Sequence, residues 1–186
     1  MNIGFAVCGS FCTYSAVFPV MADLARHHRL IPIFSFHAAS IDSRFGTARE
    51  HLRLAREICG IDPVCTIEDA EPIGPKKLLD LLIIAPCTGN TLAKLAHGIA
   101  DTPVTMAAKS HLRNGRPILI APSTNDALAV SAENIGKLLA RKNIYFVPFR
   151  QDDPAGKPAS MVADFNRIPQ AAEAASAGIQ LQPIVF

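Results

Sequence analysis

Short apolar segments alternate with amphipathic helical segments along nearly the whole chain, and this alternation constrains the fold more than any other feature. Five segments have the length and composition of strands, namely 3–8, 30–36, 78–85, 117–121 and 144–147. Helical spacing of apolar residues follows at about 14–27, 48–58, after residue 89, from 102 to about 114, and at 131–141. Such alternation predicts a doubly wound parallel sheet with helices on both faces, a three-layer α/β/α fold.

The third apolar segment, 78–85, is almost entirely apolar, as expected of a parallel strand that is buried on both faces. In such sheets ligands bind beyond the carboxyl ends of the strands. The loops that follow the first four strands are therefore the places where a site is expected.

The length of 186 residues fits one domain, since domains commonly run to ~100–200 residues. We expect a single domain over 1–186 with a loop-helix extension at about 148–186, its helix covering about 160–176. No membrane-spanning run is present, because none approaches the ~20 apolar residues that a membrane helix needs.

Composition excludes two classes of protein. The chain is 49% hydrophobic and 18% charged, with a net charge of +2, so it has neither the composition of a disordered chain nor the basic excess of a typical nucleic-acid binder. The charged fraction is below the ~25% usual in soluble domains. Two readings stay open, an apolar-rich core or a surface that is partly buried in an oligomer.

The amino-terminal sequence lacks the basic region and cleavage site of a signal peptide, and the five cysteines show no metal-ligand spacing. We therefore expect free thiols, no metal site and a cytoplasmic location.

The loops after the first and third strands carry small polar residues that lead into helices. Gly9–Thr13 fits neither the GxGxxG nor the Walker pattern, although a strand-to-helix turn favours an anion. Thr88–Thr91 offers neutral donors and acceptors around Gly89. In both loops the polar side chains could instead serve only as helix caps.

The fourth loop contains Asn125, which could orient a carboxylate or carbonyl, and Asp126, which could act as an acid or base. A plain turn with a helix cap is the alternative reading. Among the basic residues near these edges, Arg44 follows the second strand and is best placed to bind a carboxylate. Asp152 and Asp153 lie in a long loop that could be a lid, a partner contact or a solvated turn.

The stretch Pro86–Asp101 resembles the P-A-S/T-A-N-T…A-x-G-x-x-D signature of the flavoprotein family, which includes FMN-dependent cysteine decarboxylases and flavin prenyltransferases. The resemblance implies a Rossmann-like, flavodoxin-like sheet, assembly as a trimer or dodecamer, and FMN near subunit interfaces. It places FMN contacts on nine residues: Gly9, Ser10, Thr13, Ser35, Phe36, Thr88, Gly89, Asn90 and Thr91.

The chain also departs from the decarboxylases of this family. The stretch 71–79 lacks their catalytic His, and only Pro122 and Asn125 remain of their substrate motif, so cysteine decarboxylation is not expected. The prenyltransferase branch has an Arg for the FMN phosphate where this chain has Met106, and Lys109 lies one helical turn further on.

Within the family, nearly the full length resembles the branch of dipicolinate synthase B subunits, through segments such as 9–19, 71–75, 123–128 and 151–161. This resemblance implies a sporulation enzyme that works with a nicotinamide-binding A subunit, which carries NAD(P). Its reaction would oxidise a dihydrodipicolinate-type cyclic dicarboxylate to pyridine-2,6-dicarboxylate. Arg44 and Lys109 would bind the carboxylates, Asn125 would orient the substrate, and Asp126 or Glu71 would take the proton.

Two other functions stay open on the sequence. The chain could be a non-catalytic, flavin-free protein that uses the pocket for phosphate or for docking the A subunit. It could also be a stand-alone FMN-dependent decarboxylase or a prenyltransferase-like enzyme.

Overall fold

The computed structural model describes all residues, 1–186. Five parallel strands form the body of its sheet in the order β2-β1-β3-β4-β5, the order of a flavodoxin-like fold. They are β1 (Asn2–Val7), β2 (Arg29–Phe34), β3 (Leu81–Cys87), β4 (Ile118–Thr124) and β5 (Ile144–Phe146). The predicted fold class and five parallel strands are confirmed.

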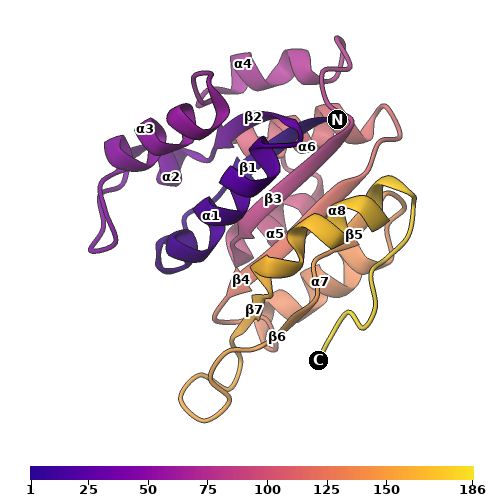
Figure 1. Ribbon diagram of the computed structural model, residues 1–186. Helices are drawn as coiled ribbons and strands as arrows, with labels where there is room; N and C mark the ends of the chain where they lie inside the picture. The colour runs from indigo at the N-terminus through magenta and orange to yellow at the C-terminus, as the bar shows by residue number, and fades with distance from the viewer.

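Helices cover both faces of this sheet (Figure 1). The helices α1 (Tyr14–Ala25) and α8 (Ile168–Ser176) lie in front of it, and α5 (Gly89–His97), α6 (Pro103–Leu112) and α7 (Val130–Leu139) lie behind it. The helix α3 (Ala48–Cys59) packs beside α1 and β2 at one edge. Shorter elements are α2 (Phe36–Ser40), α4 (Ile67–Ala70) and the 3-10 turns η1 (Phe11–Thr13), η2 (Glu71–Ile73) and η3 (Phe165–Arg167).

The middle of the sheet forms the core. Every residue of β3 is buried, which is the physical reason for its nearly uninterrupted apolar sequence. At the start of α6, the side chain of Thr102 accepts a hydrogen bond from the Thr105 amide and Pro103 occupies the first turn, as the sequence predicted.

The carboxyl-terminal segment differs from the prediction. It adds antiparallel strands to the sheet, which is therefore mixed rather than purely parallel. Two strands, β6 (Phe149–Gln151) and β7 (Met161–Ala163), form an antiparallel hairpin, and β7 pairs with the end of β4. The helix predicted from about 160 therefore begins only at Ile168. Three-residue strands are too short to show the alternation that reveals a strand in a sequence.

Two other boundaries were predicted wrongly. Ser35 and Phe36 were assigned to the second strand, but Ser35 caps α2 by accepting a hydrogen bond from the Ala38 amide, and Phe36 begins that helix. The third strand begins at Leu81 rather than Leu78.

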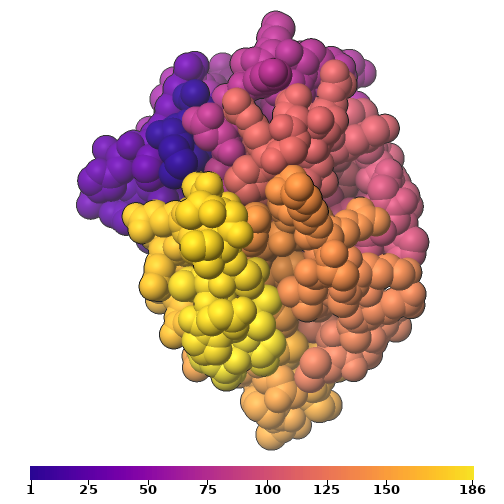
Figure 2. Space-filling view, turned by 90° about the vertical axis from the view of Figure 1, so that its right-hand side faces the viewer, coloured from indigo at the N-terminus to yellow at the C-terminus, as the bar shows by residue number.

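Figure 2 shows the carboxyl-terminal residues lying over one side of the molecule, with the β6–β7 hairpin projecting below them. Gln180 fastens this segment by hydrogen bonds of 2.7 Å to both the amide and the carbonyl of Phe146. No helix is long and apolar enough to cross a membrane.

Candidate functional site

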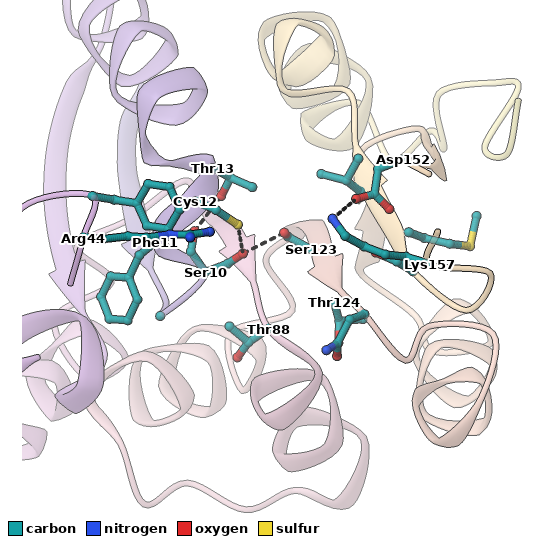
Figure 3. Close-up of a pocket in the computed structure, with 16 residues that line it drawn as sticks. Ser10, Phe11, Cys12, Thr13, Arg44, Thr88, Ser123, Thr124, Asp152 and Lys157 are labelled. Carbon is teal, nitrogen blue, oxygen red and sulfur yellow. Dashed lines mark hydrogen bonds and ion pairs between the residues drawn. The ribbon is translucent and has the colours of Figure 1, made fainter. Parts of the chain in front are cut away.

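The main cleft opens at the carboxyl ends of β1 and β4, where the parallel-sheet rule predicts a site (Figure 3). Its volume is about 540 Å³, within the ~300–1,000 Å³ typical of ligand pockets. Its walls are formed by Thr88 and by four segments of the chain, namely residues 9–13, 44–45, 123–125 and the hairpin residues 152, 157 and 160–162.

The floor of the main cleft joins the loop after β1 to the end of β4. The Ser10 Oγ lies 2.8 Å from the Ser123 Oγ, and the Thr13 hydroxyl donates to the Ser10 carbonyl at 2.8 Å. Neither Ser10 nor Thr13 caps a helix with its side chain, so the capping alternative is wrong for this loop. The backbone amides of Phe11 and Cys12 have no acceptor within the chain and are available to an anion.

Two of the predicted substrate-binding and catalytic residues lie in the main cleft, Arg44 and Asn125. The Arg44 guanidinium lies 4.8 Å from the centre of the Phe45 ring, and it has no carboxylate partner among the ion pairs of the chain. Arg44 is therefore free to bind an anionic group.

Asp126 lies next to the main cleft but does not line it. Its Oδ1 accepts hydrogen bonds from the Thr124 hydroxyl at 2.5 Å and the Ser131 hydroxyl at 2.8 Å. Thr124 itself lines the cleft, so its hydroxyl connects the cavity to the carboxylate behind it.

The β6–β7 hairpin brings a cation that the sequence did not single out, Lys157. Its Nζ lies 3.4 Å from the Oδ2 of Asp152, and both residues line the main cleft. The Ser160 hydroxyl contributes most to lowering the pKa of Asp152, and Lys157 contributes less, so Asp152 is a carboxylate near neutral pH. Lys157 was missed because nothing in its local sequence indicates that the hairpin turns back over β4.

A second hollow, the side cavity, shares Gly9 and Thr88 with the main cleft and has a volume of about 430 Å³. Six of the nine residues expected to contact FMN line it, namely Gly9, Ser35, Phe36, Thr88, Asn90 and Thr91. The Thr88 hydroxyl caps α5 by accepting from the Thr91 amide at 3.4 Å, so the capping interpretation holds there. The amides of Gly89 and Asn90 have no acceptor within the chain.

The side cavity contains one cation, Lys94, which is paired internally. Its Nζ lies 2.8 Å and 2.9 Å from the two carboxylate oxygens of Asp101. The hydrogen bond from Lys94 lowers the pKa of Asp101. The cavity therefore offers mainly neutral hydroxyl, amide and backbone donors.

Gly89 lines neither hollow. A Cβ at this position would lie 2.6 Å from Thr124 Oγ1, 2.8 Å from Ser131 Oγ and 2.9 Å from Asp126 Oδ1. Gly89 has no side chain, and this allows α5 to approach the end of β4 and the loop after it. The space beside Gly89 is filled by protein side chains, not by a ligand.

The structure does not bring Lys109 or Glu71 to either hollow. Lys109 is exposed in the last turn of α6, which leads toward the amino end of β4. Glu71 is exposed in η2, which precedes the amino end of β3. The cleft lies at the carboxyl ends of the strands, so both residues lie at the opposite side, near the amino ends of the strands.

The cysteines and the other possible metal ligands form no group of three or more that could hold a metal ion. Burial raises the pKa of Cys8 to about 11, and burial also raises that of Cys87. Cys12 is exposed at the main cleft, with its Sγ 3.9 Å from the Ser10 Oγ.

Comparison with known proteins identifies relatives of this arrangement. The model of the family described as Flavoprotein matches residues 1–172. The B subunit of dipicolinate synthase from Bacillus subtilis is 45% identical over 185 residues, which cover 99% of this chain and 92% of that protein.

Solved structures give the same relationship. The crystal structure of the dipicolinate synthase B subunit from Bacillus halodurans superposes with a TM-score of 0.91 at 42% identity, and the match covers 100% of this chain and 95% of that one. The FMN-dependent cysteine decarboxylase SpaF superposes with a TM-score of 0.64 at 26% identity, covering 95% and 97% of the two chains.

Proposed function

The chain belongs to the flavoprotein family, and on that basis we propose that it is the B subunit of a dipicolinate synthase that works with a nicotinamide-binding A subunit. The observation that carries this proposal is similarity over almost the whole length to two such B subunits. The main cleft supports it, because Arg44 and Asn125 provide a cation and an amide suited to a carboxylate-bearing substrate.

We propose the main cleft as the substrate site and the side cavity as the FMN site. The cavities adjoin through Gly9 and Thr88, so groups bound in them would be neighbours. The residues present fit FMN, since hydroxyls, a side-chain amide and free backbone amides surround the side cavity. Ser35, Thr88, Asn90 and Thr91 would hold it there. When bound, FMN supplies an acceptor for a hydride.

Formation of pyridine-2,6-dicarboxylate from a dihydro precursor removes one hydride and one proton. We propose that Asp126 takes the proton through the Thr124 hydroxyl, which lines the cleft and is bonded to the Asp126 carboxylate at 2.5 Å. FMN in the side cavity, or NAD(P) on the A subunit, would supply the acceptor for the hydride. Glu71 and Lys109 have no part in this scheme, because they lie outside both hollows.

One observation favours a second candidate, a flavin-free protein that uses the side cavity to dock the A subunit. The cation in the cavity, Lys94, is already neutralised by Asp101 at 2.8 Å. The absorbance spectrum of the purified chain after addition of FMN and gel filtration separates the two. Retained flavin absorbance supports an FMN site, and a colourless protein without FMN affinity supports the second candidate.

We also propose that the chain assembles as a homo-oligomer. The support is two neighbouring exposed apolar side chains, Leu128 just before α7 (54% exposed) and Val130 at its first position (80% exposed). Light scattering on the purified chain would measure its mass. Val130→Asp should lower an oligomeric mass, and a wild-type monomer would contradict this assembly.

Complementation tests the proposed function in cells. The gene for this chain is expressed in a Bacillus subtilis strain that lacks its own dipicolinate synthase B subunit, and dipicolinate is measured in sporulating cultures. Restored dipicolinate supports the role. An unchanged deficiency despite normal accumulation of the protein contradicts it, and Arg44→Gln, expressed equally, should restore less than the wild-type chain.

A further inference from the structure

Two cations enter the main cleft from opposite sides. Figure 3 shows the Arg44 side chain entering from the β2 side and the Lys157 side chain entering from the hairpin, with Ser10 and Ser123 between them. The two cations differ in their surroundings: Arg44 has no carboxylate partner, whereas Lys157 is paired with Asp152.

We propose that Arg44 and Lys157 form a two-point clamp for a substrate with two carboxylates, and that the second carboxylate displaces Asp152 from Lys157. This inference rests on the proposed function, since it takes the main cleft as the substrate site. It assigns Lys157 as a specificity-determining residue and Asp152 as its resident counter-ion.

The Lys157–Asp152 ion pair has the geometry and exposure of a contact that a substrate carboxylate can replace. Its atoms are 3.4 Å apart, and the side chains are 58% exposed for Lys157 and 30% exposed for Asp152. Such solvent-exposed pairs contribute little free energy. A substrate carboxylate that contacts Lys157 while its other carboxylate is held by Arg44 competes well, because the second contact is made within one bound molecule.

The backbone around Lys157 is held in place, so the exchange needs only side-chain movement. The Lys157 amide donates to the Asp153 carbonyl at 2.7 Å, and the Gln151 side-chain amide donates to the Pro158 carbonyl at 2.8 Å. The Gly156 amide donates to the Asp153 carboxylate at 2.9 Å. A lysine has a flexible stem and three donors, which suits it to change partners from a fixed backbone position.

Calorimetry with the purified full-length chain tests the clamp. The probes are pyridine-2,6-dicarboxylate and pyridine-2-carboxylate, which differ in one carboxylate. Wild-type protein should bind the dicarboxylate more tightly. Lys157→Gln should weaken dicarboxylate binding about tenfold or more, as expected for a lost charge-assisted contact, and should change binding of the monocarboxylate little. Arg44→Gln should weaken binding of both.

The matched control is Lys137→Gln, which removes an exposed lysine from an ion pair with Glu133 at 2.6 Å outside the cleft. It should leave both affinities unchanged. Asp152→Asn gives the sharpest readout, because the amide keeps an acceptor for Ser160 but removes the competing charge. It should strengthen dicarboxylate binding, opposite in sign to Lys157→Gln.

The clamp is overturned if wild-type protein binds both probes equally or binds neither. It is also overturned if Lys157→Gln, folded by circular dichroism, retains the wild-type preference, or if Asp152→Asn weakens the dicarboxylate as much as Lys157→Gln does. These results are separate from the proposed function, which fails instead when the chain together with the A subunit forms no dipicolinate. Binding is measured on this chain by itself and without turnover.

Discussion

The hydroxyl oxygens of Ser10 and Ser123 lie 2.8 Å apart and tie the loop after β1 to the end of β4 across the floor of the main cleft. Ser123 is 8% exposed, so its hydroxyl has little access to water as an alternative partner. The contact therefore links the two segments that shape the cleft.

Removing either hydroxyl should lower the free energy of unfolding by about 0.5–1.5 kcal/mol, the usual net value of such a bond. Urea unfolding of Ser10→Ala, Ser123→Ala and the double variant forms a double-mutant cycle. We expect the double variant to be about as stable as the less stable single variant. Additive losses would show that the two hydroxyls do not interact.

Gly89→Ala should destabilise the protein by about 1–3 kcal/mol, the cost of overpacking, because its Cβ would lie 2.6 Å from Thr124 Oγ1. Gly136→Ala is the control, since a Cβ there meets nothing within 4 Å and α7 gains a better helix former. It should stabilise by about 0.5–1 kcal/mol. Equal effects of the two variants on the thermal midpoint would contradict this packing.

Alkylation should distinguish the cysteines. Cys12 is exposed at the main cleft, whereas Cys8 and Cys87 are buried and burial raises the pKa of both. Peptide mapping by mass spectrometry after brief iodoacetamide treatment should find Cys12 modified well before those two. Bound pyridine-2,6-dicarboxylate should slow its modification. Equal rates for Cys12 with and without the dicarboxylate would place the ligand elsewhere.

His111 should make stability depend on pH. It is 1% exposed, and burial lowers its pKa to about 4 while Nε2 donates to the Pro117 carbonyl at 2.9 Å. The unfolded chain binds this proton near pH 6.5 and the folded chain only near pH 4. The free energy of unfolding therefore falls as the pH falls through this range, by at most about 3 kcal/mol.

The measurement is urea unfolding at several pH values for wild-type protein and His111→Asn. The variant should be less stable at neutral pH but should lose less stability between pH 6.5 and 4. Parallel pH profiles for the two proteins would show that His111 does not cause this dependence.

The sequence predicted the body of the sheet well because burial on both faces leaves a strong local signal. Segment 78–85 shows this signal, and all seven residues of β3 are buried. The β6–β7 hairpin left no such signal, because each strand has three residues and takes its position from pairing with the end of β4.

The same distinction applies to the site. Arg44 and Asn125 were identified because they lie in the connections after β2 and β4, whose carboxyl ends point to the same side of the sheet. Lys157 could not be placed, since its position depends on a hairpin that turns back over the cleft. Lys109 was selected because it is a cation one helical turn after Met106, the position of an arginine in related proteins, and this spacing does not show that the last turn of α6 lies toward the amino ends of the strands.

Reconstitution tests the central claim most directly. The purified chain is mixed with a purified nicotinamide-binding A subunit, NAD(P), FMN and the dihydrodipicolinate-type precursor, and pyridine-2,6-dicarboxylate is quantified over time. The account predicts that the product forms when both proteins are present and that neither one by itself supports the rate. It would be contradicted if the A subunit without this chain formed the product at the full rate, or if the two folded proteins together formed none.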